Sequence, residues 1–295
     1  MQTEIEKLLH DYLSYLEIEK NRSPKTRENY EHYLREFLKF SKAKSAKDIT
    51  EEAVREFRIY LNRRDIKKVT QSYYIIALRN FLKYLARRDV KVLASEKIEL
   101  PKIPERQIEV LEYGDLERLL QAPKGTDLRS LRDKAILETL FSTGLRLSEL
   151  CKLSRYIDLK RGELSVRGKG DKLRVVFLSD GTKQAIKNYL DKRTDAEEVL
   201  FLSLTRAGKT LGPITPRAVQ RMIDTRAREA GIAKHIHPHQ LRHSFATDLL
   251  INGADLRSVQ ELLGHANVST TQVYTHLTNK ELREIHKTFH ARRRK

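Results

Sequence analysis

The sequence has a single cysteine, Cys151, and no tryptophan among its 295 residues. One thiol cannot form an internal disulfide, and it cannot supply a zinc site built on paired cysteines. No run approaches the roughly 18 apolar residues that a membrane span requires. The first residues, MQTEIEKLLHDYL, mix charges and lack the apolar stretch of a signal peptide. We therefore expect a soluble cytoplasmic protein in a reducing compartment, with no membrane partner.

Glycine and proline are also sparse, at 12 and 7 residues, whereas charged residues make up 33% of the chain and apolar residues 39%. The apolar residues recur at helical spacing, so the chain can bury cores and is not expected to be disordered. The 58 basic residues outnumber the 40 acidic ones, which gives a net charge of +18 spread over both halves. This charge predicts a polyanionic partner, with nucleic acid as the first candidate and a location at the nucleoid.

Four amphipathic helices are expected in roughly the first 90 residues, where apolar side chains recur every three or four positions. Ser23-Pro24 breaks the first helix and suits the first turn of the second. Thr50 precedes two glutamates, which is typical of a capped helix start. Thr70 or Ser72 is expected to open the fourth helix.

The boundary between two domains is expected where prolines interrupt the helical pattern. Pro101 and Pro104 lie three residues apart in ELPKIPERQIE, a segment that favours an extended connector. We predict a helical domain over residues 1–100, a linker over 101–110 and a second domain over 111–295.

The second domain is mostly helical but contains two runs rich in branched residues. Leu164–Val166 and Leu173–Leu178 predict two strands joined by a turn that contains Lys169. The predicted fold class is therefore mainly α with a small β-hairpin, an α+β module following an all-helical one. Helices are expected at 115–121, 129–142, 181–193, 216–230, 238–251, 255–263, 269–276 and 278–289.

Six of the ten histidines are concentrated in residues 235–276. His239 and His243 have the spacing of zinc ligands on a helix, but Gln240 stands where an HExxH site has glutamate, so no metal is expected. On the same helix His239 and Arg242 lie one turn apart. An imidazole beside a guanidinium suits chemistry on a phosphodiester, and a basic helix that faces DNA without chemistry is the alternative.

Three further residues could complete such a site. Arg146 follows Gly144 at a helix start, where backbone N–H groups favour an anion, although it could instead pair with Glu149. Lys169 lies between two glycines at the hairpin tip, where it could approach a duplex or be merely solvated. Tyr274 is presented by a short helix and could equally belong to the core.

Taken together, these residues resemble the active-site set of the tyrosine recombinases, also called the phage integrase family. The blocks TGLRLSEL, GKGDK, HPHQLRHSFAT and LLGHANVSTTQVYTH are similar to the family's motifs and occur in the family's order. The resemblance covers nearly the whole chain and extends to the Xer-type recombinases of bacteria and archaea. The matching residues are Arg146, Lys169, His239, Arg242, His265 and Tyr274.

The resemblance implies covalent catalysis on DNA. Tyr274 would attack the scissile phosphate and form a 3′-phosphotyrosyl bond, which a 5′-hydroxyl later reverses. Arg146 and Arg242 would neutralise the phosphate oxygens in the transition state. Lys169 would protonate the leaving 5′-oxygen.

The two histidines of the set would handle protons and hydrogen bonds. His239 would act as general base or assist proton transfer, and His265 would hydrogen-bond the phosphate. No metal or cofactor is implied, since two arginines and a lysine supply the positive charge. Two-metal nucleases instead need clustered carboxylates, which the sequence lacks at metal-binding spacing.

The resemblance also implies an architecture. The first domain corresponds to a SAM-like core-binding domain, and with the catalytic domain it would form a C-shaped clamp on double-stranded DNA. Each subunit would cut one strand, so exchange between duplexes requires a tetramer on paired sites. A last helix with Leu282, Ile285 and Phe289 would pass to a neighbouring subunit, or would dock on its own.

Chromosome dimer resolution is the expected role, and a partner recombinase or a DNA translocase could be required. Mobile-element integrases or resolvases share this layout, and type IB topoisomerases share the catalytic set. A DNA-binding regulator with the fold alone would have no need of Tyr274.

Overall fold

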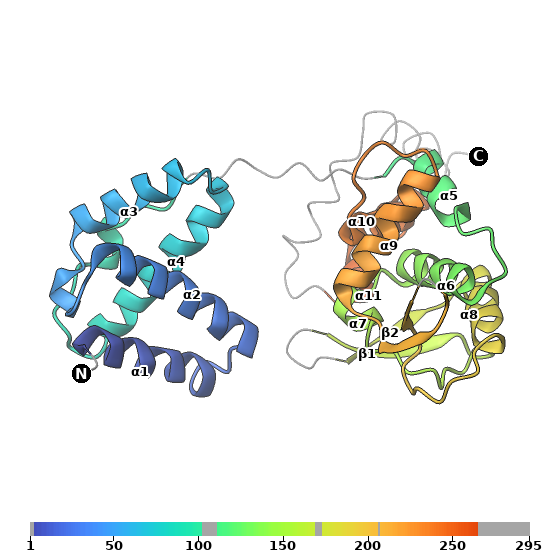
Figure 1. Cartoon of the computed structure of the whole chain (residues 1–295), viewed down its shortest axis with the longest axis horizontal. Helices are drawn as coiled ribbons and strands as arrows, with labels where there is room; N and C mark the ends of the chain where they lie inside the picture. The colour runs from blue at the N-terminus through green and yellow to red at the C-terminus, as the bar shows by residue number, and fades with distance from the viewer. Residues whose placement is uncertain (1–2, 102–110, 169–172, 206, 265–295) are drawn as a thin grey trace, which may run out of the picture. The chain divides into compact units, whose positions relative to one another are not determined.

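The computed structural model describes residues 3–101, 111–168, 173–205 and 207–264, which form parts of two compact units. The first unit spans residues 1–106 and the second residues 107–295 (Figure 1). Most of the predicted linker lies outside the described residues, and the predicted domain limits stay a prediction.

Within residues 3–101, the first unit is a bundle of four helices and two short 3₁₀ helices. Its core is formed by one face of each long helix, including Tyr12, Phe37, Phe57 and Phe81, each 1% exposed or less. The elements are α1 (Glu4–Ile18), α2 (Pro24–Ser41), η1 (Ala46–Asp48), α3 (Glu51–Arg63), α4 (Lys68–Ala86) and η2 (Ser95–Lys97).

Two of the three predicted helix starts are confirmed. The Ser23 hydroxyl accepts the Thr26 N–H at 3.2 Å, and the Thr50 hydroxyl accepts the Ala53 N–H at 3.2 Å. The predicted start of α4 at Thr70 or Ser72 is wrong, because the helix begins one turn earlier at Lys68. Lysine is a good helix former, so this turn forms without a side-chain cap.

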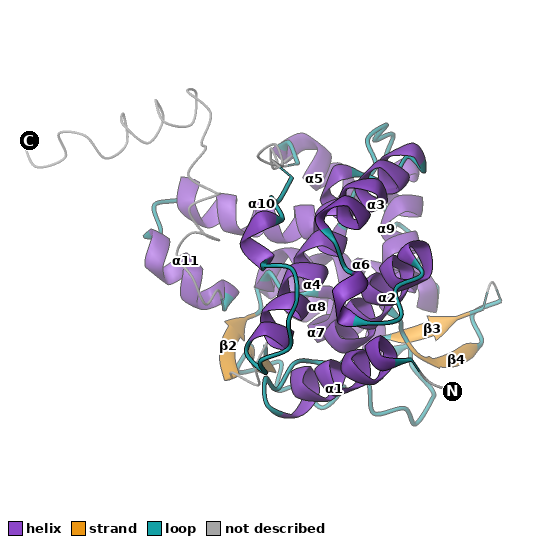
Figure 2. Ribbon diagram, turned by 90° about the vertical axis from the view of Figure 1, so that its left-hand side faces the viewer, coloured by secondary structure: helices purple, strands orange, loops and turns teal. Residues whose placement is uncertain are grey.

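The second unit is built around the buried helix α6 (Leu128–Thr143), which packs against α8 (Asp180–Asp191) and α10 (Pro238–Ile251). Strand β1 (Glu163–Arg167) pairs antiparallel with β2 (Leu173–Phe177) as predicted. The described part of this unit also contains α5 (Tyr113–Gln121), α7 (Leu147–Leu150), α9 (Pro216–Glu229) and α11 (Leu256–Leu263). Helix α11 packs beside β2 (Figure 2).

A second hairpin, β3 (Leu202–Leu204) with β4 (Thr210–Pro213), was not predicted. Its strands are short, and Gly212 and Pro213 in β4 hide any alternation of apolar and polar residues. The predicted class, mainly α with a small β-hairpin in the second domain, is confirmed by the described residues. The predicted helices at 269–276 and 278–289 lie outside them.

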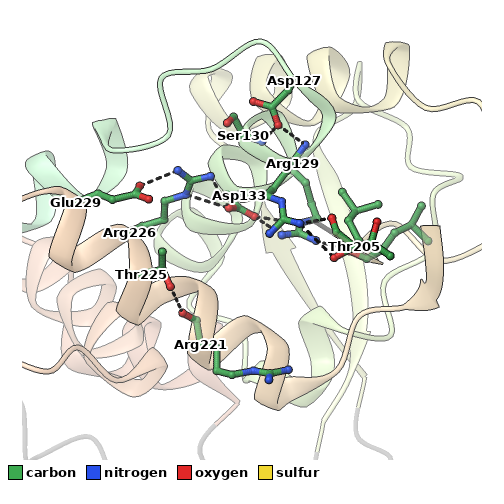
Figure 3. Close-up of polar contacts among 12 residues, drawn as sticks. Asp127, Arg129, Ser130, Asp133, Thr205, Arg221, Thr225, Arg226 and Glu229 are labelled. Carbon is green, nitrogen blue, oxygen red and sulfur yellow. Dashed lines mark hydrogen bonds and ion pairs between the residues drawn. The ribbon is translucent and has the colours of Figure 1, made fainter. Parts of the chain in front are cut away.

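A buried charge network ties α6 to α9 and to the β3–β4 hairpin (Figure 3). One oxygen of Asp133 accepts Arg132 Nε at 3.0 Å and Nη2 at 2.6 Å, and the other accepts Arg226 Nε at 3.0 Å and Nη2 at 2.8 Å. Arg132 also donates to the Leu202 carbonyl at 2.9 Å. Each residue of this trio presents 12% or less of its side chain to solvent. The network therefore holds three elements of the second unit together.

Cys151 ends α7 and packs against the core of the second unit. Burial raises the pKa of its thiol to about 11. The thiolate, which is the reactive form, is therefore scarce at neutral pH.

Gly144, which ends α6, adopts a left-handed conformation with φ of +58°. A Cβ at this position would lie 2.9 Å from Cε1 of Phe245 and 3.1 Å from Cδ2 of Leu263. Gly144→Ala is therefore expected to lower the free energy of unfolding by about 2–4 kcal/mol, from backbone strain and overpacking together. Urea unfolding followed by circular dichroism measures this loss.

Gly114 in α5 provides the control, because a Cβ at this position would have no atom within 4 Å apart from its chain neighbours and the backbone of its own helix, and its φ is not positive. Gly114→Ala should be neutral or stabilising by up to about 1 kcal/mol, since alanine favours the helix. Equal losses in the two variants would contradict the strain argument.

Candidate active site

The described residues include three of the six predicted site residues: Arg146, His239 and Arg242. Arg146 is the N-cap of the single-turn helix α7, directly after the turn that ends α6. His239 and Arg242 lie in the first turn and a half of α10, where Pro238 occupies the first helical position as predicted. The other three, Lys169, His265 and Tyr274, lie outside the described residues.

The Arg146 side chain, 29% exposed, is held by the carboxylate of Glu149. Arg146 Nη1 donates to Oε1 at 2.9 Å, and the Arg146 backbone N–H donates to Oε2 at 2.8 Å. Its Nη2 also donates to the carbonyl of Gly264 at 3.3 Å. The Arg146–Glu149 ion pair that the sequence offered as the alternative is thus present. The backbone N–H of Arg146, which could have bound an anion at this helix start, donates to Glu149 instead.

Arg242 is almost completely buried, with 4% of the residue exposed. Its Nη1 donates to the carbonyl of Gly144, and its Nη2 donates to the carbonyl of Leu263 at 2.6 Å. His239, three residues earlier, is exposed. Arg242 is therefore fixed inside the unit by two carbonyl groups, whereas His239 lies at its surface.

The end of α11 brings distant residues together. The carbonyls of Leu262, Leu263 and Gly264 accept hydrogen bonds from Arg174, Arg242 and Arg146 respectively. The last carbonyls of a helix have no partner within it and carry the negative end of its dipole, so guanidinium groups bind there favourably. Two predicted site residues, Arg146 and Arg242, thus bind the carbonyls of neighbouring residues, Gly264 and Leu263, which immediately precede His265 in the sequence.

Two residues at this place were not predicted as site residues. Glu149 is 6% exposed and was considered only as an ion-pair partner, although its place three residues after the N-cap is a capping signal. Arg174 has a side chain that is 9% exposed. Successive side chains of a strand point to opposite faces, so Arg174 lies on the same face of β2 as the buried Val176. An arginine on this inward face is the sequence signal that could have identified it as a site residue.

Glu149 stays ionised at low pH because of its partners. Burial alone would raise its pKa, but hydrogen bonds from Arg174 and Arg146 outweigh this and lower the pKa from 4.5 to about 2. A carboxylate with a lowered pKa stabilises the fold fully above its unfolded pKa, and the gain is lost as the pH falls from about 4.5 through about 2. At neutral pH this gain is about 3 kcal/mol.

We therefore expect the wild type to lose about 2 kcal/mol more stability than Glu149→Gln between pH 7 and pH 3. Urea unfolding at the two pH values measures both losses, and other carboxylates contribute equally to each protein. Parallel losses would show that the Glu149 pKa is not lowered.

No metal-binding group of three His, Cys, Asp or Glu side chains occurs within residues 3–101, 111–168, 173–205 and 207–264. In the same part of the chain, no helix is both long enough and apolar enough to cross a membrane.

Comparisons with known proteins identify the family. A model described as the phage integrase family matches residues 109–281, and one described as the phage integrase N-terminal SAM-like domain matches residues 9–89. Tyrosine recombinase XerC of Pelobacter propionicus is 40% identical over 287 residues, which cover 95% of this chain and 94% of that protein. Tyrosine recombinase XerD of Listeria innocua is 38% identical over 296 residues, which cover 97% and 99%.

A solved structure agrees with these relatives. XerH site-specific recombinase, bound to palindromic difH substrate in a post-cleavage complex, has a TM-score of 0.72 and 26% identity, covering 94% of this chain and 82% of that chain. The integrase of the Tn1549 transposon, in complex with transposon right end DNA, shares the fold with a TM-score of 0.74 at 19% identity, covering 96% of this chain and 99% of that chain. The chain belongs to the phage integrase family of tyrosine recombinases.

Proposed function

We propose that the protein is an Xer-type site-specific recombinase that cuts and rejoins double-stranded DNA through a 3′-phosphotyrosyl intermediate. The observation that carries this proposal is the meeting of Arg146 and Arg242 at the carboxyl end of α11, in a chain of this family. Two guanidinium groups in one place suit a phosphodiester whose charge grows in the transition state. The XerC and XerD relatives, similar over nearly the full chain, support the Xer-type assignment.

In this proposal Tyr274 is the nucleophile. It attacks the scissile phosphate, the bond to the 5′-oxygen breaks, and Lys169 gives that oxygen its proton. Arg146 and Arg242 stabilise the phosphate oxygens, each by about 3 kcal/mol if they resemble other preorganised donors.

The histidines complete the set, His239 by accepting or relaying the tyrosine proton and His265 by hydrogen-bonding the phosphate. The reaction needs no metal because these residues provide both the charge and the proton transfers.

The proposed partner is a recombination site in duplex DNA, clamped by the core-binding and catalytic domains. The XerH complex with difH substrate supports this partner. Four subunits would act on paired sites and exchange their last helices, the segment with Leu282, Ile285 and Phe289. We propose chromosome dimer resolution at the nucleoid as the role, with a partner recombinase or DNA translocase as an auxiliary factor.

The test is to incubate the protein with genomic DNA of its source organism in EDTA, denature with SDS, and sequence the DNA that stays attached. Attachment at one chromosomal locus, lost in Tyr274→Phe, is the expected result. Attachment at mobile-element ends would redirect the role to integration, and scattered attachment would indicate topoisomerase activity. A strict requirement for Mg²⁺ would overturn the proposed chemistry.

A further inference from the structure

Arg174 connects three segments that carry predicted site residues. It lies on β2, which follows Lys169 in the sequence, and its side chain is 9% exposed. Its Nη1 and Nη2 donate to the two oxygens of Glu149 at 3.1 Å and 2.7 Å. Its Nε donates to the carbonyl of Leu262 at 3.1 Å, near the end of α11.

The carboxylate of Glu149 is shared between two arginines. Oε1 accepts Nη1 of Arg146 and Nη1 of Arg174, and Oε2 accepts the backbone N–H of Arg146 and Nη2 of Arg174. The bidentate pair with Arg174 fixes the plane of the carboxylate, and that plane sets where Arg146 is held. Without Arg174, the buried carboxylate would lose two of these four donors.

Gly264 has no side chain, and this leaves space for the side chain of Arg174 to reach Glu149 and Leu262. It has φ of +63°, and a Cβ there would lie 3.0 Å from Cδ and 3.3 Å from Nη1 of Arg174. The guanidinium of Arg174 thus packs directly against the backbone that precedes His265. Arg174 therefore joins the β1–β2 hairpin to Glu149, which holds Arg146, and to the end of α11.

We propose that Arg174 is a positioning residue of the recombination reaction: through Glu149 it sets the guanidinium of Arg146, and through Leu262 it sets the end of α11. This inference rests on the proposed function and deepens it. Arg174 need not touch DNA in this role. Its loss should slow cleavage of bound DNA and leave binding almost unchanged.

Arg226 offers a matched control. It is a similarly buried arginine, 12% exposed, and two of its N–H groups donate to one oxygen of a buried carboxylate, that of Asp133. It also pairs with Glu229, and neither of these acids belongs to the site. Arg226→Met therefore removes a comparable ion pair without touching the groups that hold Arg146.

The first measurement compares Arg174→Met, Arg174→Lys and Arg226→Met on a nicked duplex that carries the site recovered from genomic DNA. For Arg174→Met we expect DNA affinity within about threefold of wild type and single-turnover formation of the covalent complex about 100-fold slower, as misplacement of a catalytic group produces. Arg174→Lys keeps the positive charge but loses the planar guanidinium, so it should fold and cleave about tenfold faster than Arg174→Met. Arg226→Met should lower Tm but cleave at the wild-type rate below that Tm.

A second measurement does not depend on cleavage. Guanidinium signals are recorded by ¹⁵N NMR without DNA, and the Arg146 signal is identified by its loss in Arg146→Lys. It should shift or broaden in Arg174→Met and stay in place in Arg226→Met. An unchanged Arg146 signal, or wild-type cleavage by Arg174→Met, would overturn the inference. If the wild type formed no covalent complex with genomic DNA, the proposed function would be overturned instead, and the NMR comparison, which uses no DNA, would still decide whether Arg174 positions Arg146.

Discussion

Replacing Arg242 by lysine should slow covalent attachment to DNA by about 10²–10³-fold, with the protein still folded. The guanidinium of Arg242 is held by the carbonyls of Gly144 and Leu263 and must still present donors to a phosphate. Lysine has one ammonium group with no planar fork, so it cannot satisfy both carbonyls and the phosphate in a fixed geometry. Single-turnover assays in EDTA measure the loss.

Arg193 provides the matched control for this variant. Its side chain is fully buried, and its Nη1 donates to the carbonyls of Val199 and Leu200 at 2.7 Å and 2.8 Å. Arg193→Lys should lower stability in the same way as Arg242→Lys and leave the rate unchanged. If both variants lost rate in proportion to stability, Arg242 would be a structural residue only.

The largest loss of stability is expected from Asp133→Asn, at about 3–5 kcal/mol. The Asp133 carboxylate lies between Arg132 and Arg226 and is 4% exposed, so its removal leaves two buried guanidinium groups without their shared anion. Urea unfolding at pH 7 measures the difference.

Glu229→Gln is the control, because Glu229 pairs with the same Arg226 but is 48% exposed. Solvent screens such a pair, and its loss should cost at most about 1 kcal/mol. Similar losses in the two variants would show that burial does not set the strength of this network.

Local patterns in the sequence were sufficient for most elements of the fold. Helix starts followed from Ser23-Pro24 and Thr50, and the hairpin from two branched runs, because these signals act over a few residues. The start of α4 was predicted too late, since lysine extends a helix without a visible cap.

Contacts between residues far apart along the chain could not be predicted from the sequence. Nothing in the local pattern indicates that Arg242 binds the carbonyls of Gly144 and Leu263, or that Arg174 reaches Glu149 and Leu262. These contacts depend on how α10, α11 and β2 pack, which periodicity does not determine. The roles of the predicted site residues came from family resemblance and stay a prediction.

The half-buried thiol of Cys151 makes the natural protein well suited to fluorescence labelling. With a pKa of about 11, only about one thiol in ten thousand is ionised at pH 7, so maleimide dyes should largely ignore it. A cysteine introduced on the surface of each unit would then be the main point of attachment. Energy transfer between two such dyes would follow, in single molecules, how the distance between the units changes when DNA is added.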